Sequence, residues 1–263
     1  MASIYSPKSN KELKSAARGQ LIGKYSGAIL AVITISVIQL CVLNLANSSY
    51  TGSISSYLLR FTISIIVDLL SGVLIFGQAR YFLCLVRGTE PLMIKEIFYG
   101  FKNNVDKSII IQAVFTGISL LADIPAVLIT LGYIVIDDKQ YIAASLLIYA
   151  FDFILIFVTK LFLGLSFYIL NDNPDMTVGE ILGKSVELMR NKKGRYFLIC
   201  LSTLPLFILG FLGLFIGSLW VSVYLETLLA NFYLDCIKEE PAPVFKEEEK
   251  TVFTDENSTS DIH

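Results

Sequence analysis

The sequence predicts an all-α fold: a polytopic membrane helix bundle with six transmembrane helices and three amphipathic helices at the cytoplasmic interface. Six long apolar stretches cover most of the chain, and the connections between them are alternately rich in Lys and Arg and nearly free of them. A water-soluble core gives no reason to sort basic residues into every second loop, whereas insertion into a membrane does. Composition agrees, because 54% of the residues are hydrophobic and 17% are charged, against roughly 45–50% and about 25% in ordinary globular domains.

Each predicted span has the roughly 17 to 25 mainly apolar residues that cross the hydrocarbon core as a helix. We expect the spans at 25–45, 62–84, 108–131, 143–168, 196–212 and 214–237. The first is longer than the apolar part of a signal peptide, about 7 to 15 residues, so we expect it to be retained. The last two form one apolar run that contains Gly210, Gly213 and Gly217, and we expect a tight turn near Gly213 between two closely packed helices. Residues 238–263, with a net charge of -5 from eight acids and three Lys, are expected to form a disordered acidic cytoplasmic tail.

The basic residues indicate how the chain is threaded. Of the 21 Lys and Arg, eighteen lie in the N-terminal segment, in the second and fourth connections with their flanks, and in the tail. The other connections contain only Arg60 and Lys139, and Lys160 falls within a span. Because Lys and Arg are retained on the cytoplasmic side, both termini are expected in the cytoplasm.

A polar segment with helical periodicity precedes the first, third and fifth spans. Ser9 with Glu12 and Thr177 with Glu180 have the spacing of capping boxes, and Pro91 suits the first position of the middle helix. The apolar stripe of that middle helix would consist of Ile94, Ile97, Phe98 and Phe101. We expect these helices to lie in the membrane interface, apolar faces in the acyl boundary and basic side chains toward anionic headgroups. The predicted headgroup contacts are Lys11, Lys14, Arg18, Lys95, Lys102, Lys192, Lys193 and Arg195.

The order of interfacial helix, outward span and returning span occurs three times along the chain. One interpretation is a threefold internal repeat of topology. The other is that linkers beside spans are commonly amphipathic, because residue identity between the three units is slight.

Ionisable side chains within a span cost free energy, about 2.5 to 3.5 kcal/mol each at the centre, so each is a candidate functional residue. These residues are Asp68, Asp123, Asp152, Lys160 and Glu226. They are interpreted either as a polar path for a proton, an ion or a small solute, or as pairs that only lock the bundle. Asp123 is the strongest functional candidate because the nearby Pro125 weakens the helix beside a charge.

Other features limit the function classes. The chain lacks the common nucleotide-binding, serine-hydrolase and zinc-protease motifs, so no enzymatic activity is expected. The only histidine is His263 and the cysteines form no CxxC pair, so neither a metal site nor a cofactor is expected. The charge balance gives no concentrated basic face, so nucleic-acid binding is not expected. The tyrosines near the span ends predict an aromatic belt at the membrane surface. They are Tyr25, Tyr81, Tyr133, Tyr141, Tyr168, Tyr196 and Tyr233.

Several short segments carry a resemblance to a known family. They are 77–83 (GQARYFL), 87–91 (RGTEP), 98–102 (FYGFK), 168–175 (YILNDNPD), 185–189 (SVELM) and 230–233 (ANFY). With them the chain resembles, over most of residues 10–237, a bacterial multi-pass membrane family known as domain of unknown function 975. The resemblance implies a protein of the bacterial cytoplasmic membrane and brings no established activity or catalytic residue. Glu226 departs from the family's pattern, which has an uncharged residue there.

Two functions are consistent with these features. The first is a non-enzymatic protein that organises anionic lipid or holds a membrane-protein partner, which includes a second copy of the chain, through its basic interfacial helices. The alternative is a transporter, or a transporter subunit, that moves a small solute or an ion by means of Asp68, Asp123, Asp152 and Lys160.

Overall fold

The computed structural model describes residues 7–48, 51, 53–91, 93–136, 140–212 and 216–238, and this part of the chain is all-helical. The helices are α1 (Asn10–Leu21), α2 (Tyr25–Ser48), α3 (Ile54–Val86), α4 (Met93–Ile97), α5 (Val105–Ile136), α6 (Gln140–Leu163), α7 (Ser166–Asp172), α8 (Val178–Met189), α9 (Lys193–Leu212) and α10 (Ile216–Lys238), with a 3-10 helix η1 (Phe98–Phe101) after α4. The all-α prediction is therefore confirmed. The predicted tail lies outside the described residues except for Lys238, and so does the predicted turn residue Gly213.

Among the described residues, five stretches are long and apolar enough to cross a membrane, and each coincides with one of the first five predicted spans. They are Tyr25–Val42, Ile54–Val86, Val105–Ile129, Ala150–Asp172 and Lys193–Gly210. The sixth predicted span falls on α10, which is not among them. Its described residues include several polar side chains, and these are enclosed by the bundle: Val223, Leu228 and Phe232 are fully buried, and Thr227, Asn231 and Asp235 are at most 7% exposed. A helix enclosed by other helices needs no continuous apolar surface, because protein groups rather than lipid contact it.

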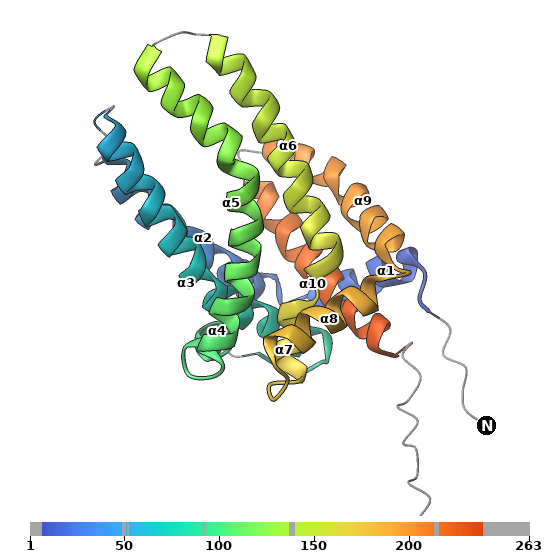
Figure 1. Ribbon diagram of the computed structural model, residues 1–263. Helices are drawn as coiled ribbons and strands as arrows, with labels where there is room; N and C mark the ends of the chain where they lie inside the picture. Colours follow the sequence, from blue (N-terminus) through green and yellow to red (C-terminus); the bar gives the residue numbers. More distant parts are fainter. Residues whose placement is uncertain are drawn as a thin grey trace, which may run out of the picture.

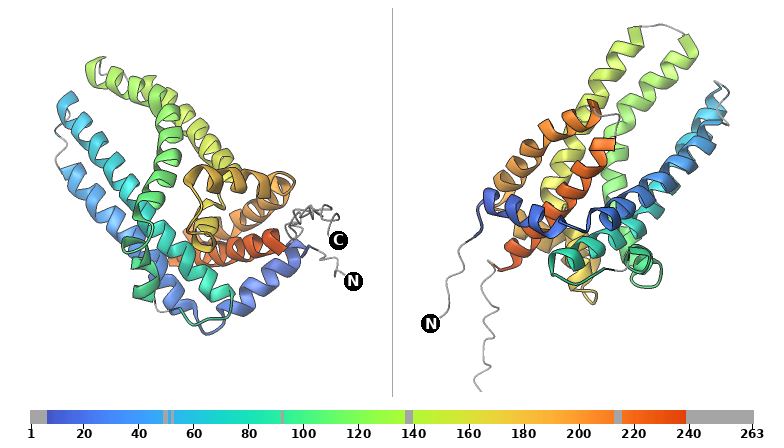
Figure 2. Two further views of the ribbon diagram at one scale, coloured as in Figure 1. Left: turned by 60° about the horizontal axis from the view of Figure 1, so that its bottom comes forward. Right: turned by 180° about the vertical axis from the view of Figure 1, so that it is seen from behind.

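The long helices form three antiparallel pairs, α2 with α3, α5 with α6 and α9 with α10 (Figure 1). The short helices α1, α4, α7 and α8 lie together at one end of these pairs, and Figure 2 shows α1 lying across that end. There the backbone N–H of Lys8 donates to Asp235 Oδ1 at 3.1 Å, so α1 and the end of α10 meet. The helices α3 and α10 are central. Besides their own pair partners, α3 packs against α5, α7 and α10, and α10 packs against α1, α2 and α3.

Both predicted capping boxes are confirmed. The backbone N–H of Ser9 donates to Glu12 Oε2 at 2.7 Å, and that of Thr177 donates to Glu180 Oε2 at 2.8 Å, which begins α1 and α8. Backbone and side-chain hydrogen bonds from Ser9 and Thr177 lower the pKa of Glu12 and Glu180 below the ordinary glutamate value, because they favour the charged carboxylate.

The apolar faces of α1 and α8 were expected to enter the acyl boundary, and this expectation is wrong. Leu13, Ala17 and Leu21 of α1 are at most 1% exposed, and Ile181 and Met189 of α8 are fully buried, all within the protein core. Periodicity identifies the face of a helix that leaves water, but not whether lipid or protein covers it. These two helices cover the end of the bundle.

The middle segment also differs from its prediction. It consists of the five-residue α4 followed by η1, and the expected stripe divides: Ile97 is fully buried, whereas Phe98 and Phe101 are 41% and 52% exposed. The side chain of Ile94 lies outside the described part. Close backbone contact with α3 explains the change, because a Cβ on Gly77 would lie 1.9 Å from the Ile97 carbonyl oxygen.

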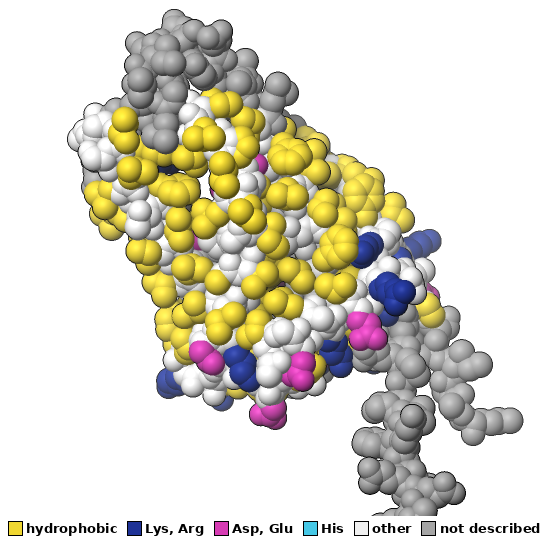
Figure 3. Space-filling model, viewed as in Figure 1, with side chains coloured by type: hydrophobic (Ala, Val, Ile, Leu, Met, Phe, Trp, Pro, Cys, Tyr) yellow, Lys and Arg dark blue, Asp and Glu magenta, His cyan; other side chains and the backbone are white. Residues whose placement is uncertain are grey.

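Figure 3 shows how the surface is divided: hydrophobic side chains cover the long helices, and charged side chains gather toward the end that holds the short helices. Large apolar side chains are strongly exposed, and Leu45, Leu121 and Phe153 each reach 71%. By contrast, Phe76 and Phe82 are buried in the charged end of the bundle, which contains much of the core. Exposed apolar area of this extent is rare on soluble monomers and is typical of a lipid-facing surface.

Candidate functional site: a polar cavity among the helices

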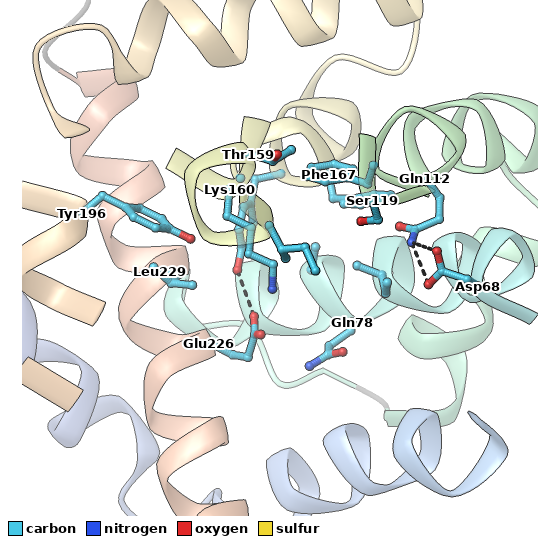
Figure 4. Close-up of a pocket in the computed structure, with 16 residues that line it drawn as sticks. Asp68, Gln78, Gln112, Ser119, Thr159, Lys160, Phe167, Tyr196, Glu226 and Leu229 are labelled. Carbon is cyan, nitrogen blue, oxygen red and sulfur yellow. Dashed lines mark hydrogen bonds between the residues drawn. The ribbon is translucent and has the colours of Figure 1, made fainter. Parts of the chain in front are cut away.

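A cavity of about 370 Å³ lies among α3, α5, α6, α7, α9 and α10. Its polar lining residues are Asp68, Gln78, Gln112, Ser119, Thr159, Lys160, Tyr168, Tyr196 and Glu226 (Figure 4). Three of the five ionisable residues predicted from the sequence, Asp68, Lys160 and Glu226, therefore line one cavity.

Lys160 and Glu226 face one another across this cavity. Figure 4 shows the Lys160 ammonium pointing toward the Glu226 carboxylate, and Tyr168 Oη donates to Glu226 Oε2 at 3.3 Å. Opposite charges within a bundle attract strongly, because the surroundings screen them less than water does. Glu226 is thus the acid that faces Lys160. Lys160 is nevertheless exposed, so the protein does not enclose its side chain completely.

A break between α6 and α7 brings Lys160 and Tyr168 to the same cavity. The two helices are separated at Gly164, whose backbone N–H donates to the Lys160 carbonyl oxygen at 2.9 Å. A Cβ on Gly164 would lie 2.5 Å from that oxygen and 3.2 Å from Tyr196 Oη. Only glycine fits this contact, so the break depends on the residue at 164.

Asp68 is held by two donors from α5. Gln112 Nε2 donates to both carboxylate oxygens at 3.2 Å, and Thr116 Oγ1 donates to Oδ2. Gly72, one turn after Asp68, permits this approach, because a Cβ there would lie 2.4 Å from Gln112 Cβ. Close packing of α3 and α5 thus stabilises a carboxylate within the bundle.

A second cavity, of about 360 Å³, shares Asp68 and Ser119 with the first. Its other polar lining residues are Gln39, Ser64, Thr116 and Asp123. Asp68 therefore lies between two cavities, one reaching Lys160 and Glu226 and the other reaching Asp123.

Asp123 lies in turn beside Asp152, which is 4% exposed. All five predicted ionisable residues thus occur in one series, from Glu226 and Lys160 through Asp68 to Asp123 and Asp152. Within the described part of the chain, three or more His, Cys, Asp or Glu side chains nowhere form a metal-binding group. Because this series contains one lysine and four acids, it can bind a group of either charge.

The eight predicted headgroup contacts divide into two groups. Four contact the protein itself: Lys192 Nζ donates to the Cys236 carbonyl at 3.1 Å, Lys193 Nζ lies 3.4 Å from the centre of the Phe162 ring, Arg195 pairs with Asp235 at 2.6 Å, and Arg18 Cζ lies 5.8 Å from the centre of the Tyr224 ring. The remaining four are on α1, α4 and the segment after η1. Of these, Lys11, Lys95 and Lys102 are exposed and Lys14 is partly exposed.

The prediction of an aromatic belt is wrong for four of its tyrosines. Tyr81, Tyr168, Tyr196 and Tyr233 are between 1% and 4% exposed. Tyr168 stacks on Tyr233 with ring centres 5.5 Å apart, and Tyr233 Oη donates to Asp172 Oδ2 at 3.0 Å. Tyr168, which lines the cavity, is therefore connected through Tyr233 to Asp172 at the end of α7.

Three residues that bind carboxylates of the cavity, Gln112, Thr116 and Tyr168, could not be recognised as functional candidates from the sequence. Each is an uncharged residue of a type that is common in helices. Each donates to a carboxylate whose residue lies 44 to 58 positions away in the sequence. No local pattern predicts such a contact, so only the packing of the helices reveals it.

Comparison with curated proteins and with solved structures found no match. One family model does match, over residues 1–240, and its description is protein of unknown function, DUF975. The match includes every residue that the structure describes, and it confirms the resemblance that the short segments carry. The chain belongs to the DUF975 family of proteins of unknown function.

Proposed function

We propose that this protein is an integral membrane protein that binds a small polar solute between Lys160 and Glu226 and carries it across the membrane. The observation behind this proposal is that oppositely charged side chains on different helices face a cavity of about 370 Å³. A pair that only locked the bundle would be packed between helices without open space beside it. The adjoining cavity, which shares Asp68, continues the polar path. The proposed role is not enzymatic.

The solute class follows from the lining. Cavities that bind small molecules have about 300 to 1,000 Å³, so this one suits a small solute. A zwitterion the size of an amino acid would place its carboxylate at Lys160 and its ammonium group at Glu226 or Asp68, so that every charge has a partner. Gln78 and Thr159 line the same cavity and offer further hydrogen bonds.

A ligand-dependent melting experiment tests this proposal. The purified protein is heated with each of the twenty free amino acids, and with small monocarboxylates and amines for comparison. We expect at least one amino acid to raise the melting temperature, and to be taken up by proteoliposomes, because binding only to the folded state stabilises it. Lys160→Met and Glu226→Gln should each weaken binding by about tenfold or more, since one lost charged contact is worth roughly 1.5–3 kcal/mol.

Lys95→Met is the matched control, because Lys95 is an exposed lysine of α4 and does not line the cavity. It should leave binding unchanged. If no amino acid raises the melting temperature of the wild-type protein and none enters proteoliposomes, the zwitterion proposal is wrong.

We further propose six spans, with both termini in the cytoplasm of a bacterial plasma membrane. Contacts of Asp235 support the sixth span: near the end of α10, it bonds to Lys8 before α1 and to Arg195 at the start of α9. If α9 crosses the membrane, α10 must return across it. The gathering of Lys and Arg toward this same end supports a cytoplasmic location.

A second function, contact with anionic lipid, is favoured by the segment around η1. Phe98 and Phe101 are exposed and their ring centres are 5.8 Å apart, and the exposed Lys95 and Lys102 flank them. Aromatic rings beside lysines are typical of segments that insert shallowly at a headgroup layer. In this role the basic end would organise lipid or hold a membrane partner.

A further inference from the structure

Asp152 is an unusual residue for the interior of a membrane protein. It lies on α6 within the candidate span Ala150–Asp172 and is 4% exposed. Neither of its carboxyl oxygens accepts a hydrogen bond from an N–H or O–H group of the residues that the structure describes. An ionised carboxylate that is buried without donors costs several kcal/mol, so this position calls for a specific partner.

The polar neighbour of Asp152 is a second carboxyl group. Asp123 of α5 lies within hydrogen-bonding reach of Asp152, and it also lines the second cavity. Two ionised carboxylates have no hydrogen to share, so this contact becomes a hydrogen bond only when one of the two carries a proton. A carboxyl pair at such short range holds one proton between its members, as like charges cannot both persist there.

The charged groups around the pair do not replace that proton. Asp68 of α3 lines the same cavity and is itself an acid, already bonded by Gln112 and Thr116. Lys160 lies eight residues after Asp152 on α6, a rise of about 12 Å, and faces Glu226. Arg60, near the start of α3, is exposed and does not line either cavity. Among the described side chains, no cation neutralises both carboxylates.

We propose that Asp123 and Asp152 form a proton-binding site, which holds one proton between two carboxyl groups and exchanges it with the cavity that Asp123 lines. Asp152 anchors the proton in the buried interior, and Asp123 connects it to Asp68 and the rest of the polar path. Pro125, two residues after Asp123, has no N–H to donate to the carbonyl of Leu121, which loosens α5 beside the site. The physiological role, coupling proton movement to solute movement, rests on the proposed function, but the proton site itself does not.

Infrared difference spectroscopy tests the site. A protonated carboxyl group has a C=O stretching band distinct from that of a carboxylate. At neutral pH we expect the difference spectrum between the wild-type protein and the double variant Asp123→Asn with Asp152→Asn to contain one such band. Asp106→Asn, which removes an exposed aspartate at the start of α5, should leave the band in place. A band of equal intensity in the double variant, or its absence from the wild-type protein, would overturn the proposal.

If the double variant does not fold, chemical labelling of the unaltered protein tests whether Asp123 and Asp152 share a proton. Dicyclohexylcarbodiimide reacts with protonated carboxyl groups in apolar surroundings, and mass spectrometry of peptides identifies the labelled residue. We expect label on Asp123, which lines the cavity, with less label as the pH is raised and none on Asp106. Label on neither Asp123 nor Asp152 at neutral pH would contradict a shared proton. No solute is present in either measurement. The proton site can therefore be supported even if no solute binds, and solute binding can be supported even if the proton site is absent.

Discussion

Single basic residues that are equivalent in the sequence have different environments in the structure. Arg195 is bound to Asp235, whose side chain is 1% exposed, and Arg195 Nη2 also donates to the Lys8 carbonyl at 2.5 Å. Lys95 and Lys102 are exposed beside an exposed aromatic pair. Proximity to a span predicts headgroup contact for all three, but the buried acid Asp235, 40 residues further along the chain, holds Arg195 against the protein instead.

This difference predicts opposite results for two charge removals. Arg195→Met should destabilise the fold by about 3 kcal/mol, because it removes the guanidinium group that pairs with the buried Asp235 carboxylate. Lys95→Gln with Lys102→Gln should leave the melting temperature unchanged but reduce the anionic lipid retained in native mass spectrometry. The lipid proposal would be contradicted by equal lipid retention in the double variant and the wild-type protein.

At the scale of helices, glycines decide how closely the elements pack. A Cβ on Gly210 would lie 2.7 Å from the Gly217 carbonyl carbon, which confirms the expected close approach of α9 and α10 at these two residues. Gly77 lets the end of α4 lie against α3, and Gly72 lets α5 approach α3. These contacts position Gln112 beside Asp68, so helix packing and the polar path depend on the same small residues.

Gly72→Ala tests this dependence. The added methyl group would meet Gln112 and the Ser108 carbonyl, and must push α5 away from α3, at a cost of about 1–3 kcal/mol. We expect a lower melting temperature and weaker binding of any solute that the cavity accepts. Gly117→Ala on α5 is the control, because a Cβ there would meet no atom within 4 Å. Equal melting temperatures for the two variants would show that α3 and α5 do not pack as closely as described.

At the scale of the whole molecule, charge and apolarity are separated along the axis of the bundle. The helices α1, α7 and α8 and the segment around η1 form the charged end, and the long helices expose apolar side chains beyond it. The polar series from Glu226 to Asp152 runs inside the apolar part, within the candidate spans and α10. The proposed transport requires such a polar series within the apolar part.

Labelling of single cysteines tests the six-span threading. In a protein whose four cysteines are replaced by alanine, Ser53→Cys should react with a membrane-impermeant maleimide in intact cells. Asn191→Cys and Lys238→Cys should react only after the membrane is permeabilised, because both lie at the charged end. If Lys238→Cys reacts in intact cells while Asn191→Cys does not, α10 does not return across the membrane.

From the sequence alone, the all-helical fold, five of the apolar stretches and two helix starts could be predicted. Length, hydropathy and the capping residues Ser9 and Thr177 act within a few residues of chain, so they can be recognised without knowledge of the fold. The sequence also identified Asp68, Asp123, Asp152, Lys160 and Glu226, because a charge is conspicuous in an apolar stretch.

What covers each helix face, and which polar groups meet, became known from the packing of the helices. The apolar faces of α1 and α8 contact protein rather than lipid, and α10 is central although it is the least apolar of the predicted spans. Four of the tyrosines expected at the membrane surface are buried, and one of them, Tyr168, donates to Glu226. The physical reason is that a buried face or an interior charge requires a partner, and the identity of that partner depends on helices far away in the sequence.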